Sequence, residues 1–139
     1  MNNDELKIKV ATIIAEDRAL SGKLIAPPSA MLIPFMKSRE AFFLLVSLTF
    51  TDSALLSIEA RQLCLRALQL VIRSGIANSL SGIEVVPYAQ SQGQMRRLFR
   101  LSVMKDSLDD ALRLQEQDLL NDTPGKGITC GWYVEKPSS

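Results

Sequence analysis

Histidine is absent from the sequence, and only two cysteines occur among its 139 residues. Histidine is the most frequent general base of enzymes and a common zinc ligand, so its absence excludes the usual catalytic triads and most zinc sites. We interpret Cys64 and Cys130 as small buried residues, because free cysteine is among the most buried residue types. We therefore expect no metal, no cofactor and no enzymatic activity. An enzyme made from this sequence would need carboxylates, arginines and a tyrosine such as Tyr88 or Tyr133 to converge from separate elements.

The sequence also lacks a long apolar run. No run approaches the length that spans a bilayer, and the first residues, MNNDELKIK, contain no apolar segment of the signal-peptide kind. We expect a cytoplasmic protein with no membrane partner. Hydrophobic residues make up 47% of the chain and charged residues 22%, a balance that is typical of a globular domain and excludes wholesale disorder.

The stretch from residue 41 to residue 75 organises the rest of the chain. Residues 41–50, AFFLLVSLTF, form a short run of aromatic and aliphatic side chains, which is typical of a strand covered on both faces. Thr51, Asp52 and Ser53 follow, and their side chains favour a helix N-cap. The pattern then predicts a long amphipathic helix from near Ser53 to Gly75, where glycine supplies the left-handed residue that ends a helix.

The apolar part of this helix is wider than a helix that covers one sheet face needs. Its polar positions form one narrow stripe, consisting of Glu59, Gln62, Arg66, Gln69 and Arg73. Leu65, Leu68 and Ile72 widen the apolar arc toward a second flank. We expect that another helix of the same chain or a second subunit covers this flank, which makes these three residues candidates for a partner interface.

The segment before residue 41 contains a predicted helix and a connector. The helix begins near Asn3 and ends before Gly22, and it is the natural cover for the extra flank unless it reaches to a second subunit. Residues 23–36, KLIAPPSAMLIPFM, are apolar but interrupted by proline, which indicates an irregular connector with an edge strand near residues 31–33. Met31, Phe35 and Met36 are candidates for a partner interface, and the alternative is a connector packed on its own domain.

The part after Gly75 predicts two strands, a helix and a last strand. Residues 83–86 are typical of a strand, and Pro87 indicates an edge position or a bulge. The polar residues 91–94 predict a hairpin loop, and residues 96–104 alternate with the period of a strand. A helix that begins at residue 106 or 107 ends at the turn formers 121–127, and a last strand covers 128–135.

The alternation in the last two strands assigns their side chains to faces. In the strand at 96–104, the more polar face carries Arg96, Arg100 and Ser102, while the other face carries Arg97 together with Phe99. In the last strand, Trp132 and Tyr133 point to opposite faces, so one of them belongs to the core.

The element order from residue 41 is strand, helix, strand, strand, helix, strand. We interpret this α+β pattern as a ferredoxin-like βαββαβ core at 40–136, an antiparallel sheet with its helices on one face, preceded at 1–39 by the N-terminal helix and the connector packed on it. A competing arrangement makes the N-terminal helix and the edge strand full members of a larger α+β domain. The interpretation rests on element order alone, and no family is identified.

Arg96, Arg97, Arg100 and Lys105 form the one cationic cluster that the predicted fold gives a role. On an open sheet face such residues contact the phosphates of nucleic acid, although RRLFRLSV lacks the glycine and paired aromatics of the RNP1 pattern. The alternative is an exposed hairpin whose arginines deter edge-to-edge pairing or bind the acidic C-terminal helix.

The hypothesis that follows is a small non-enzymatic protein-binding or assembly module, either a homodimer or a subunit of a larger complex. It rests on the over-wide helix, the apolar connector and the scarcity of catalytic groups. A nucleic-acid-binding module that uses the basic strand Arg96–Arg100 is the second hypothesis.

Overall fold

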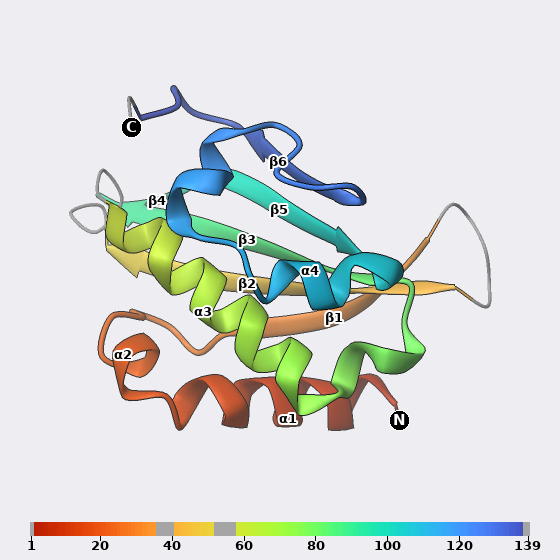
Figure 1. The fold of residues 1–139 in the computed structure, drawn as a ribbon. Helices are drawn as coiled ribbons and strands as arrows, with labels where there is room; N and C mark the ends of the chain where they lie inside the picture. Colours follow the sequence, from red (N-terminus) through yellow and green to blue (C-terminus); the bar gives the residue numbers. More distant parts are fainter. Residues whose placement is uncertain (1, 36–40, 52–57, 138–139) are drawn as a thin grey trace.

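A computed structural model describes residues 2–35, 41–51 and 58–137 as one six-stranded sheet with helices on one side (Figure 1). The strand order is β1-β2-β3-β5-β6, and β4 pairs with β3 off this path. The strands are β1 (Ser29–Pro34), β2 (Phe42–Thr51), β3 (Gly82–Ser91), β4 (Gln94–Arg97), β5 (Phe99–Met104) and β6 (Ile128–Trp132). The helices are α1 (Asn3–Ala15), α2 (Arg18–Ser21), α3 (Ile58–Ser74) and α4 (Leu108–Ala111), with short 3₁₀ turns η2 (Ile76–Ser79), η3 (Lys105–Ser107) and η4 (Glu116–Leu120).

The N-terminal helix α1 fastens the edge of the sheet. Its start is capped by Asn2, whose side chain accepts a hydrogen bond from the Glu5 backbone N–H at 2.8 Å. The buried stripe of α1 consists of Leu6, Val10 and Ile14 and joins the main core. The Asn3 side chain also accepts a hydrogen bond from the backbone N–H of Leu32 in β1, at 3.1 Å. The predicted edge strand is therefore confirmed, and β1 pairs antiparallel with β2. The predicted N-terminal helix is confirmed over Asn3–Ala15, but the rest of its predicted length forms the separate short helix α2.

The central strand and helix follow the sequence pattern, except that the described helices cover β2 on one face only, whereas its apolar run had indicated cover on both faces. β2 occupies the predicted apolar run, and its alternate side chains Leu44, Val46, Leu48 and Phe50 are fully buried against the helices. The predicted start of the long helix near Ser53 lies outside the described residues. Its end is confirmed, because α3 stops at Ser74 and Gly75 adopts a φ of 83°.

The extra apolar flank of α3 is covered by the same chain. Leu65, Leu68 and Ile72 are 5%, 0% and 7% exposed, and they lie in one core cluster with the buried stripe of α1. The N-cap residue of α2 adds a polar contact, because both carboxylate oxygens of Asp17 accept hydrogen bonds from Arg66 Nε, at 2.8 and 2.7 Å. The sequence allowed either another helix of the same chain or a second subunit as the cover, and in the structure helix α1 covers this flank.

The α+β class is confirmed, but the ferredoxin-like strand order is not. In a split βαβ unit a further strand separates the two strands that the helix connects. Here β2 and β3 are direct neighbours and parallel, with Leu45 opposite Glu84, and the chain then adds β5 and β6 outward on one side. The sheet is therefore mixed, and β1 extends it on the other side.

The second predicted helix is broken into short turns. η3 and α4 occupy its first part, and η4 begins after Gln115. The Gln115 backbone N–H donates to the Asp118 carboxylate at 2.8 Å, and such a local side-chain contact starts a new turn in place of a continuous helix. The last strand is confirmed over Ile128–Trp132.

Gly82 at the start of β3 is required by its neighbours. A Cβ there would lie 2.4 Å from the Val103 carbonyl oxygen and 2.6 Å from the Phe43 ring, whereas a Cβ at Gly131 in β6 meets nothing within 4 Å.

We predict that Gly82→Ala lowers the free energy of unfolding by about 1–3 kcal/mol, because the added methyl group must displace backbone. Gly131→Ala is the matched control and changes stability by less than about 1 kcal/mol. Urea unfolding of both variants tests this, and equal stabilities would contradict it.

Candidate binding surface on the open sheet face

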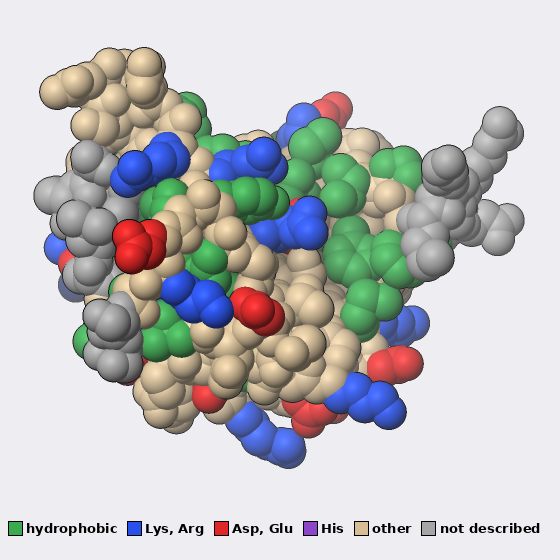
Figure 2. Space-filling model, turned by 90° about the horizontal axis from the view of Figure 1, so that it is seen from above, with side chains coloured by type: hydrophobic (Ala, Val, Ile, Leu, Met, Phe, Trp, Pro, Cys, Tyr) green, Lys and Arg blue, Asp and Glu red, His purple; other side chains and the backbone are tan. Residues whose placement is uncertain are grey.

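One face of the sheet is left uncovered by the helices of the described chain. The buried side chains of α1, α3 and α4 all join a core that contains one alternating set of strand residues, such as Leu44 and Ile83. The other set faces away from the helices, and we call this side the open face. The register aligns Met31, Leu45, Glu84, Ser102 and Thr129 as one row across it. Seen from above, hydrophobic side chains lie beside a group of Lys and Arg side chains (Figure 2).

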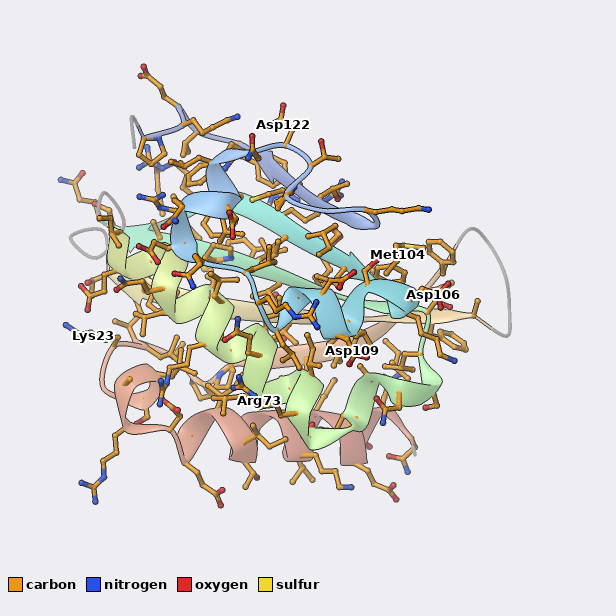
Figure 3. All side chains as sticks on the ribbon, in the orientation of Figure 1. Lys23, Arg73, Met104, Asp106, Asp109 and Asp122 are labelled. Carbon is orange, nitrogen blue, oxygen red and sulfur yellow. The ribbon has the colours of Figure 1, made fainter. Side chains whose placement is uncertain are left out.

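The apolar end of the open face is the part that β1, the start of β2 and the end of β5 form. It consists of Met31, Ile33, Phe35, Phe43, Leu45 and Met104. The rings of Phe35 and Phe43 stack with centroids 4.9 Å apart, and the Phe43 ring lies over Gly82. Met104 ends β5, before the turn that carries Asp106 (Figure 3). Met31 and Met104 remain 45% and 38% exposed, so this end presents apolar surface to solvent.

The arginine–tyrosine end of the open face consists of Tyr88, Arg97, Arg100 and Tyr133. The guanidinium carbon of Arg97 lies 4.5 Å from the centroid of the Tyr133 ring, a cation–π contact. Arg100 Nε lies 3.4 Å from Glu84 Oε1, and the Ser102 hydroxyl donates to the same oxygen at 2.8 Å. Glu84 is thus held by two neighbours, whereas Arg97 has no carboxylate within ion-pair distance among the described residues.

A shift of register places Arg97 on this face. Val85 pairs with Leu101, but Tyr88 pairs with Arg97, so one extra residue lies between these two blocks of the ladder. The Leu98 backbone N–H donates to the Pro87 carbonyl at 3.1 Å inside the shift. A bulge is therefore present opposite Pro87, in the strand that pairs with β3, and β3 itself is a central strand and not an edge.

The sequence-based assignment of the arginines to faces was wrong for Arg96 and Arg97. The extra residue reverses the alternation, so Arg97 and Arg100 share the open face, and Arg96, opposite the buried Ala89, takes the other side of the ladder. Lys105 lies beyond β5 in η3 and is exposed. The predicted cluster of four cations is therefore divided, and two of its members lie on the open face.

The predicted partner-interface residues are divided in the same way. Met31 and Phe35 lie at the apolar end, and Met36 falls outside the described residues. Leu65, Leu68 and Ile72 lie in the core on the opposite side of the sheet, so they offer no surface to a partner in this structure.

Sequence reasoning did not single out Met95 and Met104. Every methionine that the structure describes, Met31, Met95 and Met104, is at least 38% exposed and lies on the open-face side of its strand. The sequence could have placed Met104 on the same face as Ser102, because Met104 follows Ser102 with the period of a strand. Met95 could not be placed without the register of β4. Tyr133 is 46% exposed and Trp132 half-buried, as the predicted opposite faces require.

The described residues contain no group of three or more His, Cys, Asp or Glu that could hold a metal ion. Within the same residues, no helix is both long and apolar enough to cross a bilayer. A cavity of about 420 Å³ lies between α1 and the connector and is lined by small apolar residues such as Ala11, Ala15 and Pro27. None of these features adds a reactive group to the open face.

The two cysteines are free and buried, as the sequence indicated. Burial raises the pKa of the Cys64 thiol far above its usual range, and it raises the pKa of Cys130 to about 12. Both thiols are therefore protonated and shielded at mildly alkaline pH.

We predict that iodoacetamide leaves both cysteines unmodified in the native protein, because neither forms an accessible thiolate. In concentrated guanidinium chloride both should react. Intact mass before and after unfolding measures this, and alkylation of the native protein would contradict the burial of the thiols.

Comparison of the chain with protein-family models, with curated proteins and with solved structures finds no match in any of the three. The assignment of a function therefore depends on the geometry of the open face alone.

Proposed function

We propose that the chain is a non-enzymatic protein-binding or assembly module, and that its docking surface is the open face of the sheet. The observation that supports this most is the uncovered face with its three exposed methionines. Methionine is flexible and polarizable, and it is over-used at surfaces that adapt to protein partners. Exposed apolar patches with a polar border commonly mark such interaction sites.

The proposal includes assembly into a homodimer or a larger complex. A protein that docks on the open face would bury Met31 and Met104 together with the half-buried Ile33 and Leu45. Burial of apolar surface stabilises a complex by about 25 cal/mol per Å² of area removed from water. The flank of α3 contributes nothing to this assembly, because α1 already covers it.

Nucleic-acid binding is the second candidate, favoured by one observation. Tyr88, Tyr133 and two arginines lie together at one end of the open face, and single-stranded nucleic acids bind to aromatic and basic side chains in combination. The binding would weaken steeply with salt and disappear in a variant that combines Arg97→Ala and Arg100→Ala.

We predict that a photo-crosslinking residue captures a protein partner when it is placed on the open face and does not do so when it is placed elsewhere. The benzophenone amino acid would replace Met104 on the open face or, as a matched control, Ile8, which is 67% exposed on α1. In an extract of the source cells, the Met104 position should give discrete crosslinked protein bands and the Ile8 position should not. Equal crosslinking from both positions, or none from Met104, would contradict the proposal.

A further inference from the structure

We infer that the open face binds an extended acidic segment of a partner protein, with large apolar side chains at one end of the segment and carboxylates at the other. This inference rests on the proposed function and specifies its partner. Three features of the open face lead to it: the distance between its two ends, the unbalanced charge of one end, and the small side chains between them.

The two ends are separated by a distance that a short extended peptide spans. Along β2, Phe43 belongs to the apolar end, and Thr49 lies opposite Tyr88 in the register. Six residues of strand separate these positions, which corresponds to about 20 Å. A peptide that places its apolar and acidic side chains about six residues apart in an extended conformation can therefore reach both ends at once.

Small side chains occupy part of the surface between the ends, beside Val86 and the ion pair of Glu84 and Arg100. Ser29, Ser47, Thr129 and Gly131 occupy open-face positions of β1, β2 and β6. A Cβ at Gly131 would have no heavy atom within 4 Å, so a chain can approach the sheet closely there. Such a floor suits an extended backbone better than the convex side of a helix.

The charge of the arginine–tyrosine end selects an acidic partner. Glu84 is the only acidic residue in the described strands, and Arg100 and Ser102 already bind it. The guanidinium carbon of Arg97 lies over the Tyr133 ring, and Arg97 pairs with no carboxylate of the described residues, so its N–H groups are available to a planar, bidentate acceptor. A carboxylate is such an acceptor, and its hydrogen bonds to a charged guanidinium are stronger than those between neutral groups.

A second copy of the chain does not complement the open face when two open faces pack against each other. Two open faces would bring two arginine–tyrosine ends and no unbound strand carboxylate into the same interface. Uncompensated like charges lower affinity when they are desolvated.

Nucleic acid fits the surface less well than a protein segment. Only Arg97 and Arg100 of the basic cluster lie on the open face, and the other half of that face presents methionine and phenylalanine. Phosphates gain nothing from such an apolar end, whereas apolar peptide side chains do.

The test begins with a phage-displayed library of random peptides about twelve residues long, which is long enough to span the face when extended. The full chain is the target, and the enriched peptides are then synthesised and measured by fluorescence anisotropy. We expect the enriched sequences to share large apolar residues and, about six positions away, two or more Asp or Glu residues. Their affinity should fall as the salt concentration rises.

Three variants locate the contact. Arg97→Gln combined with Arg100→Gln should weaken the binding of the acidic peptide about tenfold or more, as expected for lost bonds to a charged group. Arg113→Gln is the matched control, because Arg113 is an exposed arginine on the helix side that pairs with Asp110, and it should leave the affinity unchanged. Met104→Glu should abolish binding, and unfolding curves confirm that each variant is folded.

The outcomes separate this inference from the proposed function. In one outcome, enriched peptides lose their binding to Met104→Glu and yet contain no acidic residues; in another, they bind the double arginine variant as tightly as the wild type. Either result shows that the acidic partner is wrong and leaves the open face as the docking surface. If no peptide is enriched, or binding ignores Met104, both are wrong. Two further results would also contradict the inference of an acidic segment. One is tight, salt-dependent binding of a single-stranded RNA in place of peptides. The other is a dimer in sedimentation velocity that Met104→Glu dissociates.

Discussion

The packing of all the described helices on one side of the sheet is the constraint on which the rest of the structure depends. α3 connects β2 to a parallel neighbour, β3, and its wide apolar arc then requires a second cover besides the sheet. α1 supplies that cover and also fastens β1 through Asn3. Because the helices complete one core between them, none is left to cover the other face of the sheet.

The open face acquires its chemistry from a local irregularity. The extra residue opposite Pro87 turns Arg97 to the open face, where it lies over Tyr133, while Phe99 remains in the core. β-bulges redirect side chains in this way and are common next to functional surfaces. The basic and apolar candidates, which are separate in the sequence, thereby become two ends of one surface.

Local patterns predicted the elements well where one segment determined the outcome. The run that became β2, the helix end at Gly75 and the alternation of Trp132 and Tyr133 all depend on neighbouring residues only. Strand order depends on which strands meet across the chain, so element order could not distinguish a split βαβ unit from adjacent parallel strands.

The site was predictable only in part, for a related reason. Met31, Phe35 and Arg100 could be named because their residue types suit a surface that binds a partner. The face that Arg97 occupies could not be predicted, since one extra residue in a strand reverses every assignment beyond it. Leu65 shows the same limit, because a wide apolar arc reveals that a cover exists without revealing which element provides it.

Methyl NMR of the protein with an enriched peptide tests the central claim, that the open face is the binding surface, most directly. Isotope-labelled methionine and isoleucine methyl groups report both sides of the molecule, since Met31 and Met104 lie on the open face and Ile8 lies exposed on α1. The account predicts that the signals of Met31 and Met104 shift on binding while that of Ile8 stays unchanged. A shift of Ile8 with unchanged methionine signals would contradict it.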